Sequence, residues 1–261
     1  MNQEAIDEAA RILWHSWRHG SRIDSLPASC RPGTRTDAYA IQAEVARVSG
    51  QRVAGWKIAA TSTAGQKHIG VDGPLAGRLL SGRILGSGDA VPLADNLMQV
   101  AEAEFAFRIG MSLPPRATAY TLGQVIDAVE SVHPAIEIPD SRYDDFVTAG
   151  AAQLIADNAC ACWFVLGPAS QIDWRELDLI AHRVVATRNG SVTEHGRGAN
   201  ALGDPRIALT WIANELCAYD KGLQKDDIVT TGTCIVPMPI ASGDLIRADF
   251  GKLGGVEARI D

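Results

Sequence analysis

The stretch Gln99-Val100-Ala101-Glu102-Ala103-Glu104-Phe105-Ala106-Phe107 alternates in residue type with the two-residue period of a β-strand. Its alanine and phenylalanine positions at 101, 103, 105 and 107 share one face, which is suited to burial. Glu102 and Glu104 share the other face, roughly 7 Å apart along the strand. Two like charges placed in this way repel each other unless a positive charge lies between them. The strand therefore presents either an acidic face to water or part of a cation site.

A third acidic residue favours the cation site. Glu137 stands between two isoleucines in Ala135-Ile136-Glu137-Ile138, an extended and mostly apolar setting. A bare carboxylate buried in such a setting is costly. Three carboxylates on two short strands would form an all-oxygen site, which suits Mg²⁺ or Mn²⁺ better than Zn²⁺ or Cu.

A lysine lies in another predicted strand, residues 52–60. Lys57 shares its face with Gly55 and Ala59, which are too small to shield it. Its aliphatic stem could carry the charge to water, or its ammonium could point into a cavity that holds anions. The three carboxylates elsewhere in the chain favour the second interpretation.

Length and charge limit the classes of function. A chain of 261 residues with a net charge of −7 can bury a substantial core. No Lys/Arg cluster appears that could neutralise a run of phosphates, so a nucleic-acid partner is not expected. There is no apolar run of membrane-spanning length and no signal-peptide pattern, so we expect no membrane association and a cytoplasmic location. The five cysteines are scattered without a CxxC pair and are expected to be reduced.

Helical and strand patterns are mixed along the chain without regular βαβ alternation. This favours an α+β fold with a mixed or mainly antiparallel sheet. No Gly-rich dinucleotide fingerprint, P-loop or GxSxG motif appears. Helices are predicted over residues 3–19, 37–48, 61–70, 121–132 and 205–219, and strands over residues 52–60, 99–107, 161–166, 179–187, 191–194, 227–231, 245–250 and 256–260. Thr121 and Gln124 predict a capping box, Asp204 predicts a cap before a helix that starts at Pro205, and Asn189-Gly190 predicts a two-residue hairpin.

Several short motifs, taken in order, resemble the 2-keto-4-pentenoate hydratase and 4-oxalocrotonate decarboxylase family of the fumarylacetoacetate hydrolase superfamily. The resemblance covers nearly the whole chain, including the N-terminal helices. The motifs are Asp37-Ala38-Tyr39-Ala40-Ile41-Gln42, Gly55-Trp56-Lys57-Ile58, Glu102-Ala103-Glu104, Ala135-Ile136-Glu137-Ile138, Asp140-Ser141-Arg142, Asp157-Asn158-Ala159, and Gly203-Asp204-Pro205 with Trp211.

The resemblance implies a mixed β-roll of the fumarylacetoacetate hydrolase C-terminal type with flanking helices. It implies one catalytic domain over residues 1–261, in which a helical portion, residues 1–50, packs on a roll formed by residues 51–261. It also implies Mg²⁺ or Mn²⁺ held by Glu102, Glu104 and Glu137, with Lys57 as a catalytic residue close to a small 2-oxo or 2-hydroxy-dienoate substrate. A homo-oligomer that associates with other enzymes of its pathway is expected from the same resemblance.

Two positions depart from the hydratase pattern. Leu75, in Pro74-Leu75-Ala76-Gly77, stands where the family usually has an aspartate, and Cys160 stands where a serine commonly follows Asp-Asn-Ala. Arg78 could meet a second carboxylate of the substrate or lie at the surface. We consider Leu75, Arg78 and Cys160 as candidate substrate-binding residues.

The implied activity is a lyase that adds water to a 2-hydroxy-2,4-dienoate and yields a 4-hydroxy-2-oxo acid, as in meta-cleavage breakdown of aromatic compounds. The nearest alternative is decarboxylation of a vinylogous 2-oxo acid of the 4-oxalocrotonate type, because the same metal enolate serves both reactions. An acylpyruvate C–C hydrolase would need a base, for which His68 is the histidine near the Lys57 segment. A non-catalytic 2-oxo acid binder is the remaining alternative.

Overall fold

The computed structural model describes residues 1–261, with the side chains of residues 192 and 193 outside the description. The helices are α1 (Gln3–His19), α2 (Arg35–Ser49), α3 (Thr63–His68), α4 (Leu122–Asp127), α5 (Ala151–Ala156) and α6 (Pro205–Tyr219). The strands are β1 (Val53–Ala59), β2 (Leu75–Leu80), β3 (Ile84–Gly86), β4 (Ala90–Val91), β5 (Val100–Ile109), β6 (Val129–Ile138), β7 (Trp163–Leu166), β8 (Arg183–Arg188), β9 (Val192–Arg197), β10 (Ile228–Thr233), β11 (Met238–Pro239), β12 (Leu245–Asp249) and β13 (Gly255–Ile260).

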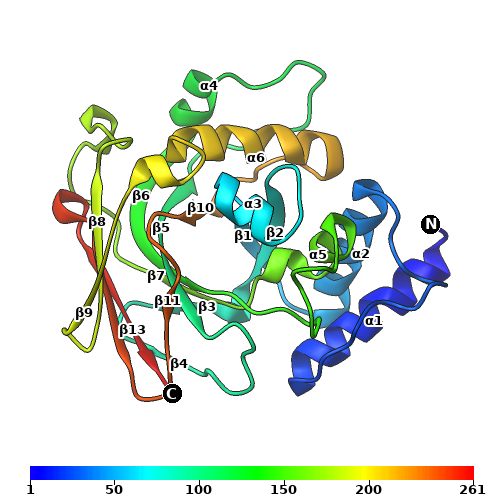
Figure 1. The fold of residues 1–261 in the computed structure, drawn as a ribbon. Helices are drawn as coiled ribbons and strands as arrows, with labels where there is room; N and C mark the ends of the chain where they lie inside the picture. The colour runs from blue at the N-terminus through cyan, green and yellow to red at the C-terminus, as the bar shows by residue number, and fades with distance from the viewer.

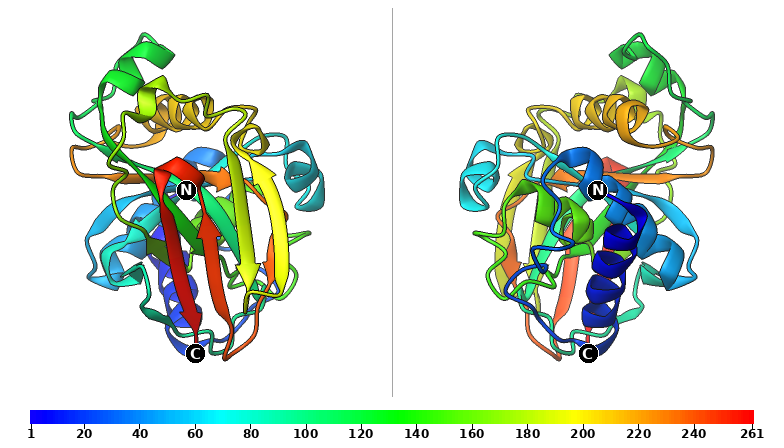
Figure 2. Two further views of the ribbon diagram at one scale, coloured as in Figure 1. Left: turned by 90° about the vertical axis from the view of Figure 1, so that its left-hand side faces the viewer. Right: turned by 90° about the vertical axis from the view of Figure 1, so that its right-hand side faces the viewer.

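The strands form two mixed sheets. The larger sheet has the order β2-β1-β10-β5-β6-β7-β3, with β11 paired to β5, and the smaller has the order β4-β13-β12-β8-β9. Most neighbours are antiparallel, whereas β1 and β10, β3 and β7, and β4 and β13 run parallel. Figure 1 shows β5 and β6 between the smaller sheet on one side and α1, α2 and α5 on the other, and Figure 2 shows the smaller sheet from its outer side. The predicted α+β fold with a mixed sheet is confirmed.

The apolar face of β5 packs against the smaller sheet, as the alternation of its sequence predicts. Phe105 and Phe107 are fully buried, and the Phe105 ring meets that of Phe250 edge to face at 5.1 Å between centroids. Because side chains alternate along a strand, this packing places Glu102 and Glu104 on the opposite face of the sheet.

The first two helices lie side by side at one flank of the larger sheet (Figures 1 and 2). The side chains of Asn2 and Thr34 accept hydrogen bonds from the backbone at the start of α1 and α2, which satisfies amide groups that a helix N-terminus otherwise leaves unpaired. Trp17 of α1 lies under the guanidinium of Arg142, 4.3 Å from its ring centroid. Packing of the helical N-terminal portion on the rest of the chain thus includes a contact with a buried charged residue.

One predicted helix is shorter than expected. The pattern over residues 121–132 predicts a single helix, but α4 ends at Asp127 and β6 begins at Val129. The predicted capping box of Thr121 and Gln124 is confirmed. The prediction failed beyond it because the valines at 129 and 132 fit either period, and pairing of β6 along the whole length of β5 determines the outcome.

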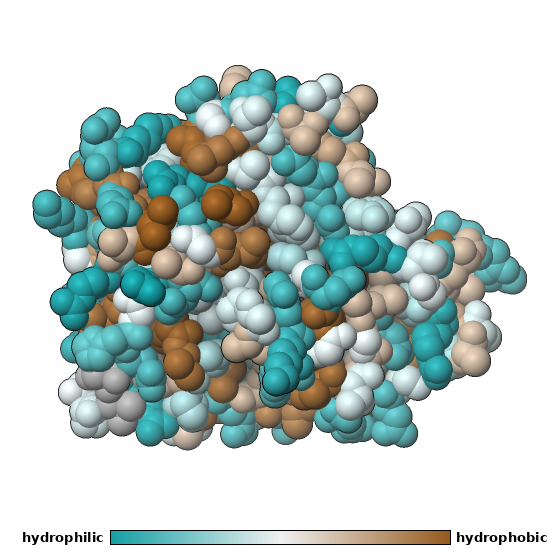
Figure 3. Space-filling view, turned by 45° about the horizontal axis from the view of Figure 1, so that its top comes forward, coloured by the Kyte–Doolittle hydropathy of each residue, from teal (hydrophilic) through white to brown (hydrophobic). Residues whose placement is uncertain are grey.

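The remaining features of the surface are ordinary. Within the described part of the chain, no helix has the length and apolar character needed to cross a membrane. On the face drawn in Figure 3, hydrophobic residues form separate patches between polar ones. Among the side chains that the structure describes, the large hydrophobic ones that are exposed are Met1, Leu97, Met111, Leu122, Ile172, Ile180, Ile207 and Val236.

Candidate active site

Three glutamates meet on the polar face of the larger sheet. The antiparallel register of β5 and β6 sets Glu102 directly opposite Glu137, while Glu104 lies two residues further along β5. Residues directly opposite each other project to the same face. One carboxylate oxygen from each of the three lies within 4.8 Å of the others. Pairing of two distant segments thus gathers the three carboxylates that the sequence singled out.

The hydrogen bonding of this cluster is incomplete. Glu104 Oε2 accepts from the Gly232 amide at 2.8 Å and from the Thr230 hydroxyl. Its Oε1 and Glu137 Oε2 are buried and have no hydrogen-bond partner among the described residues, and Glu137 Oε1 has only the nearby Lys57 ammonium. Buried carboxylate oxygens without partners are costly, and a divalent cation would satisfy them. An all-oxygen donor set of this kind fits Mg²⁺, Mn²⁺ or Ca²⁺.

Lys57 brings a positive charge to the same cluster. Its side chain is 4% exposed, and Nζ lies 3.0 Å from Glu137 Oε1. Nζ also donates a hydrogen bond of 3.0 Å to the carbonyl oxygen of Ala159. The expectation that this ammonium points inward is confirmed, since its glycine and alanine neighbours on β1 leave the route open.

Burial and mutual repulsion change the proton affinities of these groups. Burial and the Glu137 charge raise the pKa of Glu102 to about 7, even though Lys57 opposes the shift. Burial and the two neighbouring carboxylates raise the pKa of Glu104 well above its usual range, and burial raises the pKa of Glu137. For Lys57, burial disfavours the charge, but the three glutamates outweigh it and raise its pKa. The lysine is therefore a persistent cation.

A cavity of about 720 Å³ opens onto the cluster, and this volume lies in the range of about 300 to 1000 Å³ that is typical of small-ligand sites. Lys57, Glu102 and Cys160 line one part of it, and His68 and Phe146 line another. The wall between them is mostly apolar and also carries a few hydroxyl and amide groups. The cavity can hold a small organic acid with its anionic end toward Lys57 and its carbon chain against the apolar wall.

The candidate substrate-binding residues do not all reach this cavity. Cys160 lines it, and burial raises the pKa of its thiol to about 12, so the group stays protonated. Leu75 is fully buried opposite Ala59 and is not among the lining residues. Arg78 pairs with Trp56 in the β1–β2 ladder, on the face opposite Lys57, and its guanidinium binds Asp220. Neither Leu75 nor Arg78 lines the cavity, so neither is placed to contact a substrate there.

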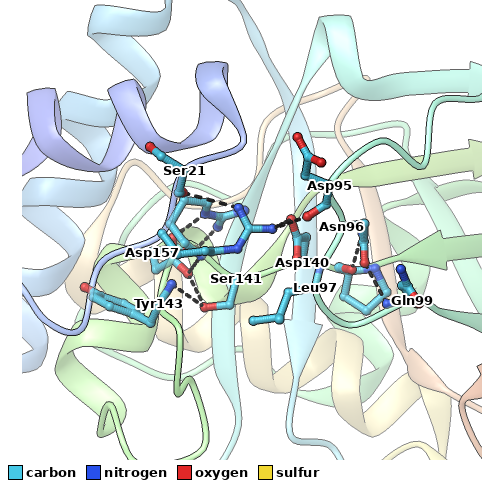
Figure 4. Close-up of polar contacts among 12 residues, drawn as sticks. Ser21, Asp95, Asn96, Leu97, Gln99, Asp140, Ser141, Tyr143 and Asp157 are labelled. Carbon is cyan, nitrogen blue, oxygen red and sulfur yellow. Dashed lines mark hydrogen bonds and ion pairs between the residues drawn. The ribbon is translucent and has the colours of Figure 1, made fainter.

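Sequence reasoning did not anticipate the polar network behind the site, part of which Figure 4 shows. Arg142 and Asp157, each 1% exposed at the side chain, form an ion pair, and the Ser141 hydroxyl donates to Asp157 at 2.9 Å. Asp140 binds Arg22 at 2.7 Å and accepts from the Leu97 amide at 2.8 Å. The only sequence signal was the presence of Asp140, Arg142 and Asp157 in two of the short motifs that resemble the family.

Together the roll, the carboxylate cluster and the cationic cavity define a class of protein: a β-roll whose polar face can hold a divalent cation beside a pocket for a small organic anion. Comparison with known proteins agrees. Residues 81–261 match the fumarylacetoacetate (FAA) hydrolase C-terminal family, and the chain belongs to that family.

Relatives align over nearly the whole chain. A 2-keto-4-pentenoate hydratase of Burkholderia vietnamiensis is 33% identical over 98% of this chain and 98% of its own. A 4-oxalocrotonate decarboxylase of Pseudomonas sp. strain CF600 is 32% identical over 87% of this chain and 85% of its own. The solved structure of 4-oxalocrotonate decarboxylase from Pseudomonas putida G7, complexed with magnesium and adipate, has a TM-score of 0.90 at 29% identity, covering 100% and 99% of the two chains.

Proposed function

We propose that this protein is a metal-dependent lyase that adds water to a 2-hydroxy-2,4-dienoate and gives a 4-hydroxy-2-oxo acid. The observation that carries the proposal is the meeting of Glu102, Glu104 and Glu137 with Lys57 at one end of a cavity of about 720 Å³. Full-length similarity to named 2-keto-4-pentenoate hydratases supports the same activity.

The three glutamates would hold Mg²⁺ or Mn²⁺ as the cofactor. A divalent cation there would supply Lewis acidity toward the carboxylate and 2-oxygen of the substrate, which lowers the cost of the enolate form. Lys57 adds a fixed positive charge beside that head group, where it stabilises negative charge developing on the oxygen.

The remaining residues bind and orient. The apolar part of the wall holds the dienoate chain and limits the access of water to the head group. Proton transfer to the far carbon converts the dienol to a conjugated enone, and water then adds at C4. Ser62, Thr61, Thr233 and Asn200 line the same cavity and could orient that water.

Decarboxylation of a vinylogous 2-oxo acid is the second candidate. The apolar character of the wall favours it, since a carboxylate loses charge as it leaves as CO₂ and an apolar setting disfavours the charged reactant. The decarboxylase structure complexed with magnesium and adipate, a dicarboxylate, supports it as well.

Product analysis with purified protein and Mg²⁺ or Mn²⁺ separates the candidates. A hydratase bleaches the absorbance of 2-hydroxypenta-2,4-dienoate and releases no gas, whereas a decarboxylase releases CO₂ from 4-oxalocrotonate. Formation of two acids from an acylpyruvate would indicate a hydrolase instead, and metal-dependent binding without turnover of any of these compounds would indicate a binder.

We further propose that the chain is one catalytic domain that works as a cytoplasmic homo-oligomer, in association with other enzymes of its pathway. The continuous packing of residues 1–50 on the rest of the chain and the alignment of relatives from end to end support the single domain. Size-exclusion chromatography with light scattering tests the oligomeric state.

A further inference from the structure

A left-handed turn lies against Lys57. Asn158, Ala159 and Cys160 have φ values of 58°, 49° and 61°, a region that residues with a Cβ seldom adopt and then usually singly. Each such residue is strained, so three in a row persist only where the surroundings fix them. The carbonyl at the middle of this turn, that of Ala159, accepts the hydrogen bond from Lys57 Nζ.

The side chain of Asn158 fixes the turn to the neighbouring strand. Its Oδ1 accepts from the Arg78 amide at 2.7 Å, and its Nδ2 donates to the Arg78 carbonyl at 2.7 Å. The approach is so close that a Cβ on Gly77 would lie 2.2 Å from the Asn158 carbonyl oxygen. Gly77 lies directly opposite Lys57 in the β1–β2 ladder, so the same pair of strands positions both the turn and the lysine.

Arg142 fixes both ends of the turn. Its guanidinium donates to the carbonyl oxygens of Asp157 and, at 2.9 Å, Ala161, and it forms the ion pair with the Asp157 carboxylate. Trp17 packs against the same guanidinium from α1. The strained turn is thus held by three sets of contacts: the hydrogen bonds of Asn158 to β2, the buried ion pair of Arg142 and Asp157, and the packing of Trp17 from α1.

We propose that Asn158 is a positioning residue, which holds the turn of residues 158–160 so that the Ala159 carbonyl aims the Lys57 ammonium at the head group of a bound 2-oxo acid. Two N–H donors of Lys57 face Ala159 and Glu137, and the third remains for the ligand. An error of about 1 Å in such a group costs up to about 100-fold in rate. That the head group belongs to a 2-oxo acid rests on the proposed function. The orientation of the Lys57 ammonium, however, governs the binding of any anion at this position.

The test compares Asn158→Ala with Asn214→Ala. Asn214 is a matched control because its side chain also accepts from a backbone amide and donates to the carbonyl of the same residue, Tyr120, but on α6 outside the cavity. Calorimetry measures binding of oxalate in saturating Mg²⁺, and of Mg²⁺ alone. We expect Asn158→Ala to weaken oxalate binding at least fivefold and to leave Mg²⁺ binding within twofold, while Asn214→Ala changes neither by more than twofold.

Turnover and a second variant complete the test. We expect kcat/KM of Asn158→Ala to fall at least tenfold, and Asn158→Gly to recover part of that loss because glycine adopts positive φ without strain. Equal effects of the Asn158 and Asn214 substitutions on oxalate affinity would overturn the positioning role. If Asn158→Ala does not fold, Asn158→Gly takes its place, and an unchanged oxalate affinity in that variant would overturn the role as well. Wild-type protein that shows the expected oxalate pattern but no dienoate turnover would refute the proposed function alone.

Discussion

Replacement of Glu104 by glutamine tests the carboxylate cluster with the least disturbance of the fold. The side chain is fully buried, and the amide oxygen of glutamine can accept the bonds from Thr230 and Gly232 that Glu104 Oε2 now accepts. Burial and the two neighbouring carboxylates raise the pKa of Glu104 well above its usual range, so the charged form of this carboxyl is disfavoured when no metal is bound. We therefore expect the free energy of unfolding of the metal-free variant to equal that of the wild type or to be higher by up to about 1 kcal/mol.

Metal binding should respond very differently. Residues that merely orient a metal ligand cost about 10- to 100-fold in affinity when changed, so loss of a charged ligand should cost at least about 100-fold, or about 2.7 kcal/mol. Calorimetric titration with Mn²⁺ measures this loss, and thermal unfolding with and without chelator measures the stability of each form. Turnover of the dienoate should fall below detection.

The matched control is Glu257→Gln, which removes one negative charge from an exposed ion pair with Arg247 on the smaller sheet. It should bind Mn²⁺ as the wild type does, because surface pairs contribute little and lie outside the site. Wild-type turnover by Glu104→Gln in the presence of chelator, or equal Mn²⁺ affinity in the two variants, would refute the assignment of Glu104.

Three further predictions concern charge. Lys57→Ala should lower kcat at least about 100-fold and weaken oxalate binding, measured by steady-state kinetics and calorimetry; unchanged kinetics would make this lysine structural. Because the pKa of Glu102 is raised to about 7 from 4.5, ionisation of this carboxyl costs the metal-free fold about 3 kcal/mol. The free energy of unfolding of the metal-free protein should therefore fall as pH rises through that interval, while Mg²⁺ affinity should rise. Calorimetry and thermal melting between pH 5 and 8 measure the two, and a constant affinity together with a constant stability would contradict this prediction. Asp157→Asn should destabilise the fold by about 3 to 5 kcal/mol in urea titrations, since it leaves the Arg142 charge buried without its partner, and a loss under 1 kcal/mol would argue against a buried pair.

Local sequence patterns were sufficient where one segment determines its own structure. The alternation around Glu102 and Glu104 predicted both the strand and its polar face, and Asn189-Gly190 correctly predicted the hairpin between β8 and β9. Helix α6 begins at Pro205 after the Asp204 cap, as predicted.

Features that depend on distant segments could not be predicted in this way. The direct opposition of Glu102 and Glu137 requires the register of β5 and β6, which no local pattern specifies. The burial of Arg78 depends on Asp220, 142 residues away in the chain. The left-handed turn at residues 158–160 has no glycine to signal it, because tertiary hydrogen bonds rather than local preference maintain it.

The most direct test of a single cation held by three glutamates is anomalous diffraction from crystals grown with Mn²⁺ and oxalate. We expect one strong manganese peak that is ligated by carboxylate oxygens of Glu102, Glu104 and Glu137, with oxalate completing the coordination beside Lys57. A manganese peak at another place, or no peak near these carboxylates at saturating Mn²⁺, would contradict the account.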